Sequence, residues 1–172
     1  MIGAVVLAAG ASSRFGSPKQ QLLLSEVVPR VRASAAIGDL VVVLGAHDVE
    51  TPERVVRCPD WQRGPGASLR SGLAALADGC EAAIVVLSDG PDINPAAIDR
   101  VVALRRTEGG DALAASYAGV RGHPVLLARA QWDSIPDGGA RAIEPRLIPC
   151  DDLGDPGDVD TPEQLPPRLR GA

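Results

Sequence analysis

The stretch Val5–Lys19 reads VVLAAGASSRFGSPK and decides how the rest of the chain is interpreted. Its apolar start predicts a buried strand, and the small residues that follow predict a loop whose backbone N–H groups can approach an anion closely. Arg14 offers a planar fork of donors and Lys19 a point charge, so together they could neutralise part of a triphosphate. The alternative is an ordinary strand-to-helix loop with solvated charges, since the stretch matches neither a Walker A loop nor G-x-G-x-x-G.

The composition indicates one globular domain that spans residues 1–172, because 172 residues with 45% apolar side chains can bury a substantial core. Aromatic residues make up only 2%, so we expect a core of Val, Leu, Ile and Ala. The net charge of -5 argues against a broad surface for nucleic acid or for an anionic membrane. A phosphate ligand would therefore need a compact site with local cations and a metal.

Three widely spaced cysteines, Cys58, Cys80 and Cys150, form no C-x-x-C pair, and their number is odd. This pattern favours buried free thiols in a reducing compartment over a disulfide framework or a zinc site. The chain shows neither a secretory apolar region nor a run of apolar residues long enough to span a membrane. We therefore expect a soluble cytoplasmic protein.

Apolar runs typical of buried strands alternate with stretches of helical period, which predicts a mostly parallel sheet covered on both faces by helices. The predicted strands are Ile2–Leu7, Leu40–Leu44, Val55–Val56, Ala82–Leu87, Ala112–Tyr117, Pro124–Leu127 and Leu147–Ile148. The predicted helices are Gln21–Ile37, Ser68–Ala77, Pro95–Arg106, Ala128–Ile135 and a closing helix Thr161–Leu169. The predicted fold class is a Rossmann-like, three-layer α/β domain, in which ligands bind at the carboxyl ends of the strands.

Aspartates at two places in the chain are candidate metal ligands. Asp89 comes directly after the strand Ala82–Leu87, where a carboxylate can bind Mg²⁺, although it could instead stabilise a turn before Pro91. Asp158 and Asp160 alternate, so they would point the same way in an extended segment. Asp160 could instead cap a helix ahead of Pro162.

Five sequence motifs, in order along the chain, resemble those of the MobA-like nucleotidyltransferases, and most closely those of the molybdenum cofactor cytidylyltransferases. They are Leu7–Lys19 (LAAGASSRFGSPK), Pro59–Leu73 (PDWQRGPGASLRSGL), Leu87–Pro91 (LSDGP), Gly122–Val125 (GHPV) and Gly157–Glu163 (GDVDTPE). Asp137–Arg141 (DGGAR) is similar to a further family segment near the acceptor pocket. The resemblance implies the nucleotide-diphospho-sugar transferase-like fold.

The resemblance also implies a role for particular residues. The nucleotide-binding set would be Leu7, Ala8, Ala9, Gly10, Ser12, Ser13, Arg14, Lys19, Gly66 and Ser68. The catalytic set would be Arg14, Lys19 and Asp89, the metal ligands for Mg²⁺ would be Asp89 and Asp158, and the acceptor pocket would contain Gly122, His123 and Pro124. From the residues alone, His123 could equally pack and hydrogen-bond within a loop, and Arg70 could be a solvated or carboxylate-paired helix residue.

The implied reaction transfers CMP from CTP to a molybdopterin-type cofactor and releases pyrophosphate, with a recipient molybdoenzyme as a possible partner. Ala9 favours CTP, because the guanylyl branch of the family has glycine there. No nucleophile with an adjacent base is present, so no covalent intermediate is implied. The alternatives are a GTP-dependent guanylyltransferase or another small-molecule nucleotidyltransferase, an NAD(P)-linked enzyme on the same scaffold, and a non-catalytic cofactor delivery protein.

Overall fold

The computed structural model describes residues 1–171, and within them seven strands form one sheet in the order β3-β2-β1-β4-β6-β5-β7. The strands are β1 (Ile2–Ala8), β2 (Ile37–Leu44), β3 (Arg54–Arg57), β4 (Ala82–Leu87), β5 (Ala112–Tyr117), β6 (Val120–Ala128) and β7 (Arg146–Pro149). β6 runs antiparallel to both of its neighbours, and every other pairing is parallel. The mostly parallel sheet predicted from the alternation of apolar runs is therefore confirmed.

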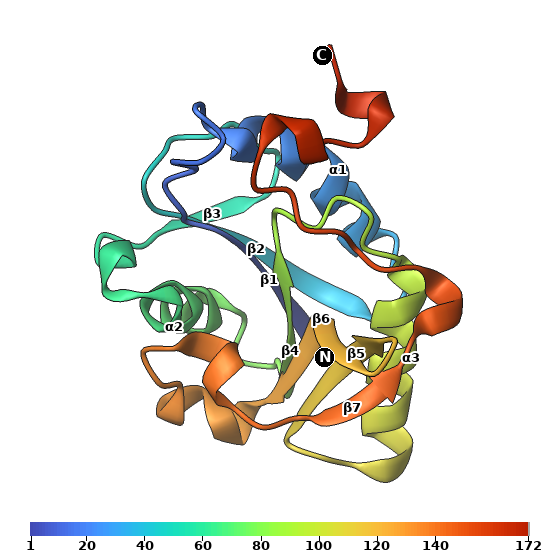
Figure 1. Ribbon diagram of the computed structural model, residues 1–172. Coiled ribbons are helices and arrows are strands. Elements are labelled where there is room, and N and C mark those ends of the chain that lie inside the picture. The colour runs from blue at the N-terminus through green and yellow to red at the C-terminus, as the bar shows by residue number, and fades with distance from the viewer. Residues whose placement is uncertain (172) are drawn as a thin grey trace.

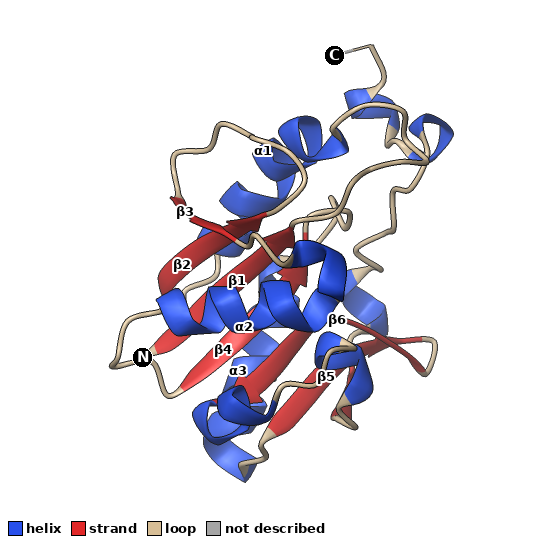
Figure 2. Ribbon diagram, turned by 90° about the vertical axis from the view of Figure 1, so that its left-hand side faces the viewer, coloured by secondary structure: helices blue, strands red, loops and turns tan. Residues whose placement is uncertain are grey.

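Helices lie on both faces of this sheet (Figure 1). α1 (Lys19–Arg32) and α3 (Pro95–Glu108) cover one face, and α2 (Pro65–Ala75) covers the other, as Figure 2 shows. Two 3₁₀ helices after β6, Arg129–Ser134 and Gly139–Ala142, extend the layer that contains α2. The three-layer fold class is thus confirmed. None of the helices in residues 1–171 is long and apolar enough to cross a membrane.

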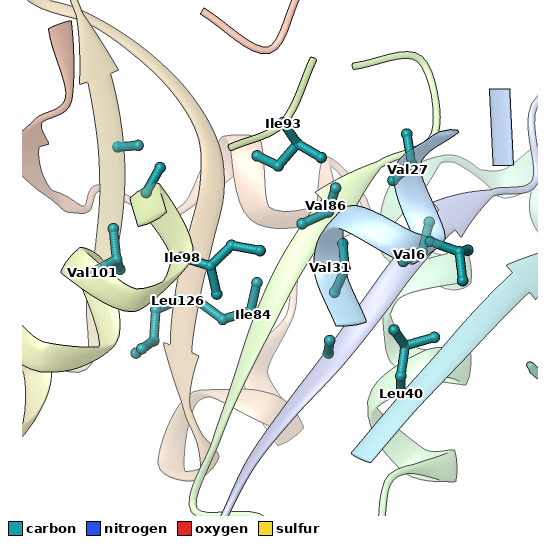
Figure 3. Close-up of a cluster of buried hydrophobic side chains, with 14 of the residues drawn as sticks. Val6, Val27, Val31, Leu40, Ile84, Val86, Ile93, Ile98, Val101 and Leu126 are labelled. Atoms are coloured by element: carbon teal, nitrogen blue, oxygen red, sulfur yellow. The ribbon is translucent and has the colours of Figure 1, made fainter. Parts of the chain in front are cut away.

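The two apolar layers follow directly from the alternation of side chains along each strand. Val6 of β1 faces α1 and α3, whereas Val5 faces α2. Figure 3 shows the first layer, where aliphatic side chains of α1, α3 and the sheet meet. The side chains labelled there are Val6, Val27, Val31, Leu40, Ile84, Val86, Ile93, Ile98, Val101 and Leu126. The aliphatic core expected from the low aromatic content is the one observed.

Gly72 allows α2 to lie directly on the sheet. A Cβ built there would be 2.5 Å from Cγ1 of Val5 and 2.8 Å from Cγ2 of Val43, both in fully buried side chains. Gly72→Ala should therefore lower the free energy of unfolding by about 1–3 kcal/mol, although alanine favours helix, because overpacking outweighs propensity. Urea denaturation measures this change. Ser71→Ala, on the same helix, is the control and should cost less; equal stability of the Gly72→Ala variant and wild type would contradict the prediction.

Several predicted helices differ from the observed ones. The helix predicted at Ala128–Ile135 is the 3₁₀ helix Arg129–Ser134, and the one predicted at Ser68–Ala77 is α2, which begins at Pro65 and ends at Ala75. The helix predicted at Gln21–Ile37 is shorter in the structure than expected. It is α1, which begins at Lys19 and ends at Arg32, and Ile37 already belongs to β2. The predicted closing helix Thr161–Leu169 is wrong, since the C-terminal segment (residues 154–171) contains only short 3₁₀ helices at Pro162–Gln164 and Pro167–Leu169. The consecutive prolines Pro166 and Pro167 account for the break, because each removes a backbone donor and disfavours helix in the residue before it.

The cysteines behave as expected from their spacing. Cys58, Cys80 and Cys150 are all buried free thiols. Burial raises the pKa of the Cys80 and Cys150 thiols, which keeps both protonated and unreactive near neutral pH.

Candidate functional site

The predicted site residues gather at the carboxyl ends of β1 and β4. These neighbouring parallel strands are in register, with Leu7 beside Leu87, so the loops that follow them leave the sheet at the same edge. The C-terminal segment runs past this edge, where the backbone N–H of Val159 donates to the carbonyl of Asp89 at 2.9 Å. The sheet topology thus brings together the motifs at Leu7–Lys19, Leu87–Pro91 and Gly157–Glu163.

Side chains that the sequence analysis did not single out hold the loop between β1 and α1 in shape. The buried Gln20 donates from Nε2 to the carbonyl of Gly10 at 2.7 Å and accepts from the hydroxyl of Ser12 at 2.7 Å. A ring nitrogen of His47 lies 2.8 Å from the carbonyl of Ala11. Gln20 directly follows Lys19, but nothing in the sequence pattern marked its amide as the group that folds the loop back onto α1.

Lys19 occupies the centre of the site. Its ammonium group donates to the carbonyl of Val159 and lies 3.3 Å from a carboxylate oxygen of Asp160 and 3.7 Å from one of Asp89. The side chain is 10% exposed, whereas that of Arg14, which lies 3.1 Å from the other oxygen of Asp160, is 73% exposed. Lys19 is therefore held in place by the protein, whereas Arg14 is solvent-exposed and lines the adjoining cavity while it pairs with Asp160.

Three carboxylates cluster beside Lys19, and two of them, Asp89 and Asp160, pair with it. One oxygen from each of Asp89, Asp158 and Asp160 lies within 4.8 Å of the others. Burial raises the pKa of Asp89, and the negative charges of Asp158 and Asp160 raise it further against the opposing effect of Lys19. A divalent cation would relieve this repulsion, and three carboxylate oxygens are the hard ligands that Mg²⁺ and Mn²⁺ prefer. The donor set therefore fits such a metal.

The carboxylate of Asp160 does not act as the helix cap that the sequence left open. Thr161 is the residue that precedes the 3₁₀ helix, and Oε1 of Gln164 accepts from the backbone N–H of Asp160 at 2.7 Å and of Thr161 at 2.8 Å. These bonds leave the Asp160 carboxylate facing Arg14 and Lys19. Asp160 consequently joins Asp89 and Asp158 in the site, although the sequence favoured Asp158 alone as the second ligand.

A cavity of about 390 Å³ lies over the loop between β1 and α1. It is lined by nine of the ten residues predicted to bind a nucleotide: Leu7, Ala8, Ala9, Gly10, Ser12, Ser13, Arg14, Lys19 and Ser68. The tenth, Gly66, does not line it, because its backbone N–H donates to the carbonyl of Asp137 at 2.9 Å and it packs against that loop. Trp61 and Gln20 line the cavity as well, and neither was in the predicted set.

A second cavity, of about 510 Å³, lies on the other side of the carboxylates. Gly122 and His123 line it, as do Arg121 and Arg141, whereas the buried Pro124 does not. Burial and the nearby guanidinium groups of Arg121 and Arg141 lower the pKa of His123 to about 4. The imidazole is therefore uncharged at neutral pH, and positive charge in this cavity comes from Arg14, Arg121 and Arg141.

The two cavities meet at the charged centre of the site. Arg14, Asp89 and Asp160 line both of them. A ligand in each cavity would thus bring its reacting group to the same three side chains.

Arg70 takes the carboxylate-paired alternative that its position on α2 left open. Its guanidinium donates to the carbonyl of Ile135 at 2.7 Å and to the carboxylate of Asp137 at 2.9 Å. Arg70 therefore fastens the segment Asp137–Arg141, which borders the second cavity, to α2. Arg70 thus helps to position the segment that forms part of the wall of the second cavity.

A comparison with protein families finds one match over most of the chain. The family model described as the MobA-like NTP transferase domain matches residues 4–146. No curated protein sequence matches. The matched range includes Lys19 and Asp89 but ends before Asp158 and Asp160.

Solved structures with the same fold cover nearly the whole chain. A homologue of Mycobacterium tuberculosis rv0371c from Mycobacterium sp. strain JC1 is 27% identical, with a TM-score of 0.78 over 98% of this chain and 94% of that one. Rv0371c from M. tuberculosis H37Rv is 26% identical, with a TM-score of 0.77 over 99% and 98%, and has also been solved in complex with manganese. Molybdopterin-guanine dinucleotide biosynthesis protein A from Archaeoglobus fulgidus is 16% identical, with a TM-score of 0.71 over 99% and 97%, a likeness of fold alone.

Proposed function

Because the chain belongs to the MobA-like NTP transferase domain family, we propose that it transfers CMP from CTP to a molybdopterin-type cofactor and releases pyrophosphate. One observation carries the proposal: the two adjoining cavities share Arg14, Asp89 and Asp160. A nucleotidyl transfer needs its two substrates to meet at a site that neutralises negative charge, and such reactions depend mainly on positioning and electrostatics.

The nucleoside triphosphate takes the cavity over the loop between β1 and α1. Arg14 and Lys19 lie on the phosphates and stabilise the charge that develops on the leaving pyrophosphate. The terminal phosphate of the acceptor lies in the second cavity, where Arg121 and Arg141 supply positive charge, and attacks the α-phosphorus in line. The new bond joins an acceptor oxygen to this phosphorus as the bond to the pyrophosphate oxygen breaks.

Asp89, Asp158 and Asp160 would hold a divalent cation, with Mg²⁺ proposed as the physiological ion. The convergence of their oxygens supports this assignment, as does the manganese complex of Rv0371c. A bound cation would supply charge neutralisation at the phosphates. Within the chain itself, the ammonium group of Lys19 lies 3.7 Å from Asp89 and 3.3 Å from Asp160 and offsets part of their mutual repulsion.

Ala9 supports cytosine as the base. It is 7% exposed and lines the nucleotide cavity at the end of β1, so its methyl group takes space that a glycine would leave open to a larger base. A guanine needs more room than a cytosine. Trp61 lines the same cavity, which makes its indole a reporter of nucleotide binding.

The proposed preference is tested by titrating CTP, GTP, ATP and NAD(P)H, with Mg²⁺ present, against the Trp132→Phe variant. That variant keeps only Trp61 of the two tryptophans. We expect CTP to change the Trp61 fluorescence and to bind about tenfold more tightly than GTP. In the matched variant Ala9→Gly, this preference should become smaller. Pyrophosphate release with CTP and a molybdopterin-type acceptor then tests the reaction itself.

Other outcomes separate the alternatives. Tighter binding of GTP would favour a guanylyltransferase, and tighter binding of NAD(P)H an NAD(P)-linked enzyme. No binding of any nucleotide would contradict the proposal and favour a protein that delivers the cofactor to a molybdoenzyme.

A further inference from the structure

The charged groups of the site come from three separate pieces of the chain. Lys19 begins α1, Asp89 follows β4, and Asp158 and Asp160 lie on the C-terminal segment. The geometry of the three carboxylates therefore depends on how firmly the C-terminal segment is held against the other two pieces. This segment lies outside the range that the family model matches.

Contacts of several kinds hold the part of the C-terminal segment that carries the aspartates. Lys19 donates to the carbonyl of Val159 and pairs with Asp160, and Arg14 also pairs with Asp160. The N–H of Val159 donates to the carbonyl of Asp89 at 2.9 Å, and the carbonyl of Pro156 accepts from the N–H of Asp92 at 2.9 Å. A small apolar cluster also contributes, formed by Leu23, Val159, Leu165 and Leu169 with Phe15 and Leu22. No regular helix or strand anchors the segment, so side-chain contacts near its end have a large share in holding it.

Arg168 connects all three pieces through one guanidinium group. Its Nε donates to the carboxylate of Glu26 at 2.9 Å, and Glu26 lies on α1. Its Nη2 donates to the carboxylate of Asp92 at 2.7 Å and to the carbonyl of Pro91 at 3.4 Å, both in the loop that carries Asp89. A planar fork of donors suits this double contact, which a lysine could make only in part.

We propose that Arg168 is a positioning residue: by holding the C-terminal segment against α1 and the loop after β4, it places Asp158 and Asp160 for the divalent cation. This inference rests on the metal site of the proposed function. The side chains of Arg168, Glu26 and Asp92 are 41%, 25% and 44% exposed, so their ion pairs contribute little to global stability. The expected effect of losing them is local opening of the segment, which is distinct from unfolding.

Hydrogen exchange of two backbone amides measures the closure without metal or nucleotide. These are the amides of Val159 and Asp92, which bond across the junction. In Arg168→Ala we expect both to exchange about fivefold faster than in wild type, and Mn²⁺ affinity to fall by a similar factor. Arg168→Lys should recover part of both effects. The control is Arg146→Ala, which removes an exposed ion pair with Glu108 and should change neither.

Each result bears on one step of the inference. Unchanged exchange at Val159 in Arg168→Ala overturns the proposed closure, even if the melting temperature falls. Faster exchange with unaltered Mn²⁺ affinity overturns the link to the metal. If the wild-type chain binds no Mn²⁺ at all, the metal site of the proposed function is wrong and the placement step falls with it, whereas the exchange data still decide the closure.

Discussion

Asp89→Asn is expected to reduce pyrophosphate release by at least about 100-fold, because it removes a charged ligand from a site where even indirect partners of a metal contribute 10- to 100-fold. The same substitution should leave the metal-free protein as stable as wild type or more stable. The pKa of Asp89 is raised, mainly by burial, so ionising this carboxyl costs more free energy in the folded protein than in the unfolded chain. A neutral amide of the same shape removes that cost, and the sign of the stability change is thus opposite to the sign of the activity change.

Two measurements separate these effects: thermal denaturation in EDTA and steady-state turnover with Mg²⁺. Asp133→Asn is the matched control, since Asp133 is an exposed aspartate on the 3₁₀ helix after β6, away from the carboxylate cluster. Turnover that survives in Asp89→Asn shows that the metal assignment is wrong. A large loss of metal-free stability would instead show that Asp89 serves mainly as a structural partner of Lys19.

Lys19→Met is expected to reduce turnover by about 10²–10³-fold, the loss typical when one preorganised electrostatic group is removed from the transition state. Its effect on metal binding should have the opposite sign. Lys19 lies 3.3 Å from Asp160 and 3.7 Å from Asp89, so its ammonium group competes with a divalent cation for the same two carboxylates. Without it, Mn²⁺ should bind more tightly and raise the melting temperature by more than in wild type.

Calorimetric titration with Mn²⁺ and thermal denaturation with and without Mn²⁺ measure this prediction. Lys19→Arg is the control, because it keeps the charge but replaces a compact ammonium with a larger planar group. Weaker Mn²⁺ binding in Lys19→Met would sink the idea of competition, and would show that Lys19 gathers the carboxylates for the metal. Unchanged turnover would contradict its role on the phosphates.

Much of the fold was predictable because local pattern and tertiary context agree. The apolar run Ala82–Leu87 predicted β4 at its observed bounds, since a strand buried on both faces needs continuous apolar side chains. The prediction of a closing helix at Thr161–Leu169 was wrong. Thr161 and Pro162 form a favourable helix start, but the two prolines at Pro166–Pro167 prevent the helix from continuing. The outermost strands were predicted short, because β3 and β7 carry mostly exposed or half-buried side chains that lack the continuous apolar pattern.

The candidate site was predictable where one motif carries both the residue and its neighbours. Nine of the ten predicted nucleotide-binding residues line one cavity. Eight of them belong to the compact stretch Leu7–Lys19, and the ninth, Ser68, comes from α2. Residues that act through a distant partner were missed. Arg121 donates to the carbonyls of Ala140 and Ile143, and Arg168 to side chains on two other elements, and neither contact leaves a signal in the local sequence.

The sequence by itself determined the α/β fold class, the loop after β1, and the residue types that can bind phosphate and metal, because strand periodicity, small loop residues and carboxylates depend on local chemistry. Only the tertiary structure decided that Asp160 joins Asp89 and Asp158, that Lys19 pairs with Asp89 and Asp160, and that two cavities meet there. These relations join residues about 70 and 140 positions apart, as in Lys19 with Asp89 and Lys19 with Val159. Such contacts arise from the strand order and from the path of the C-terminal segment, which no local pattern specifies.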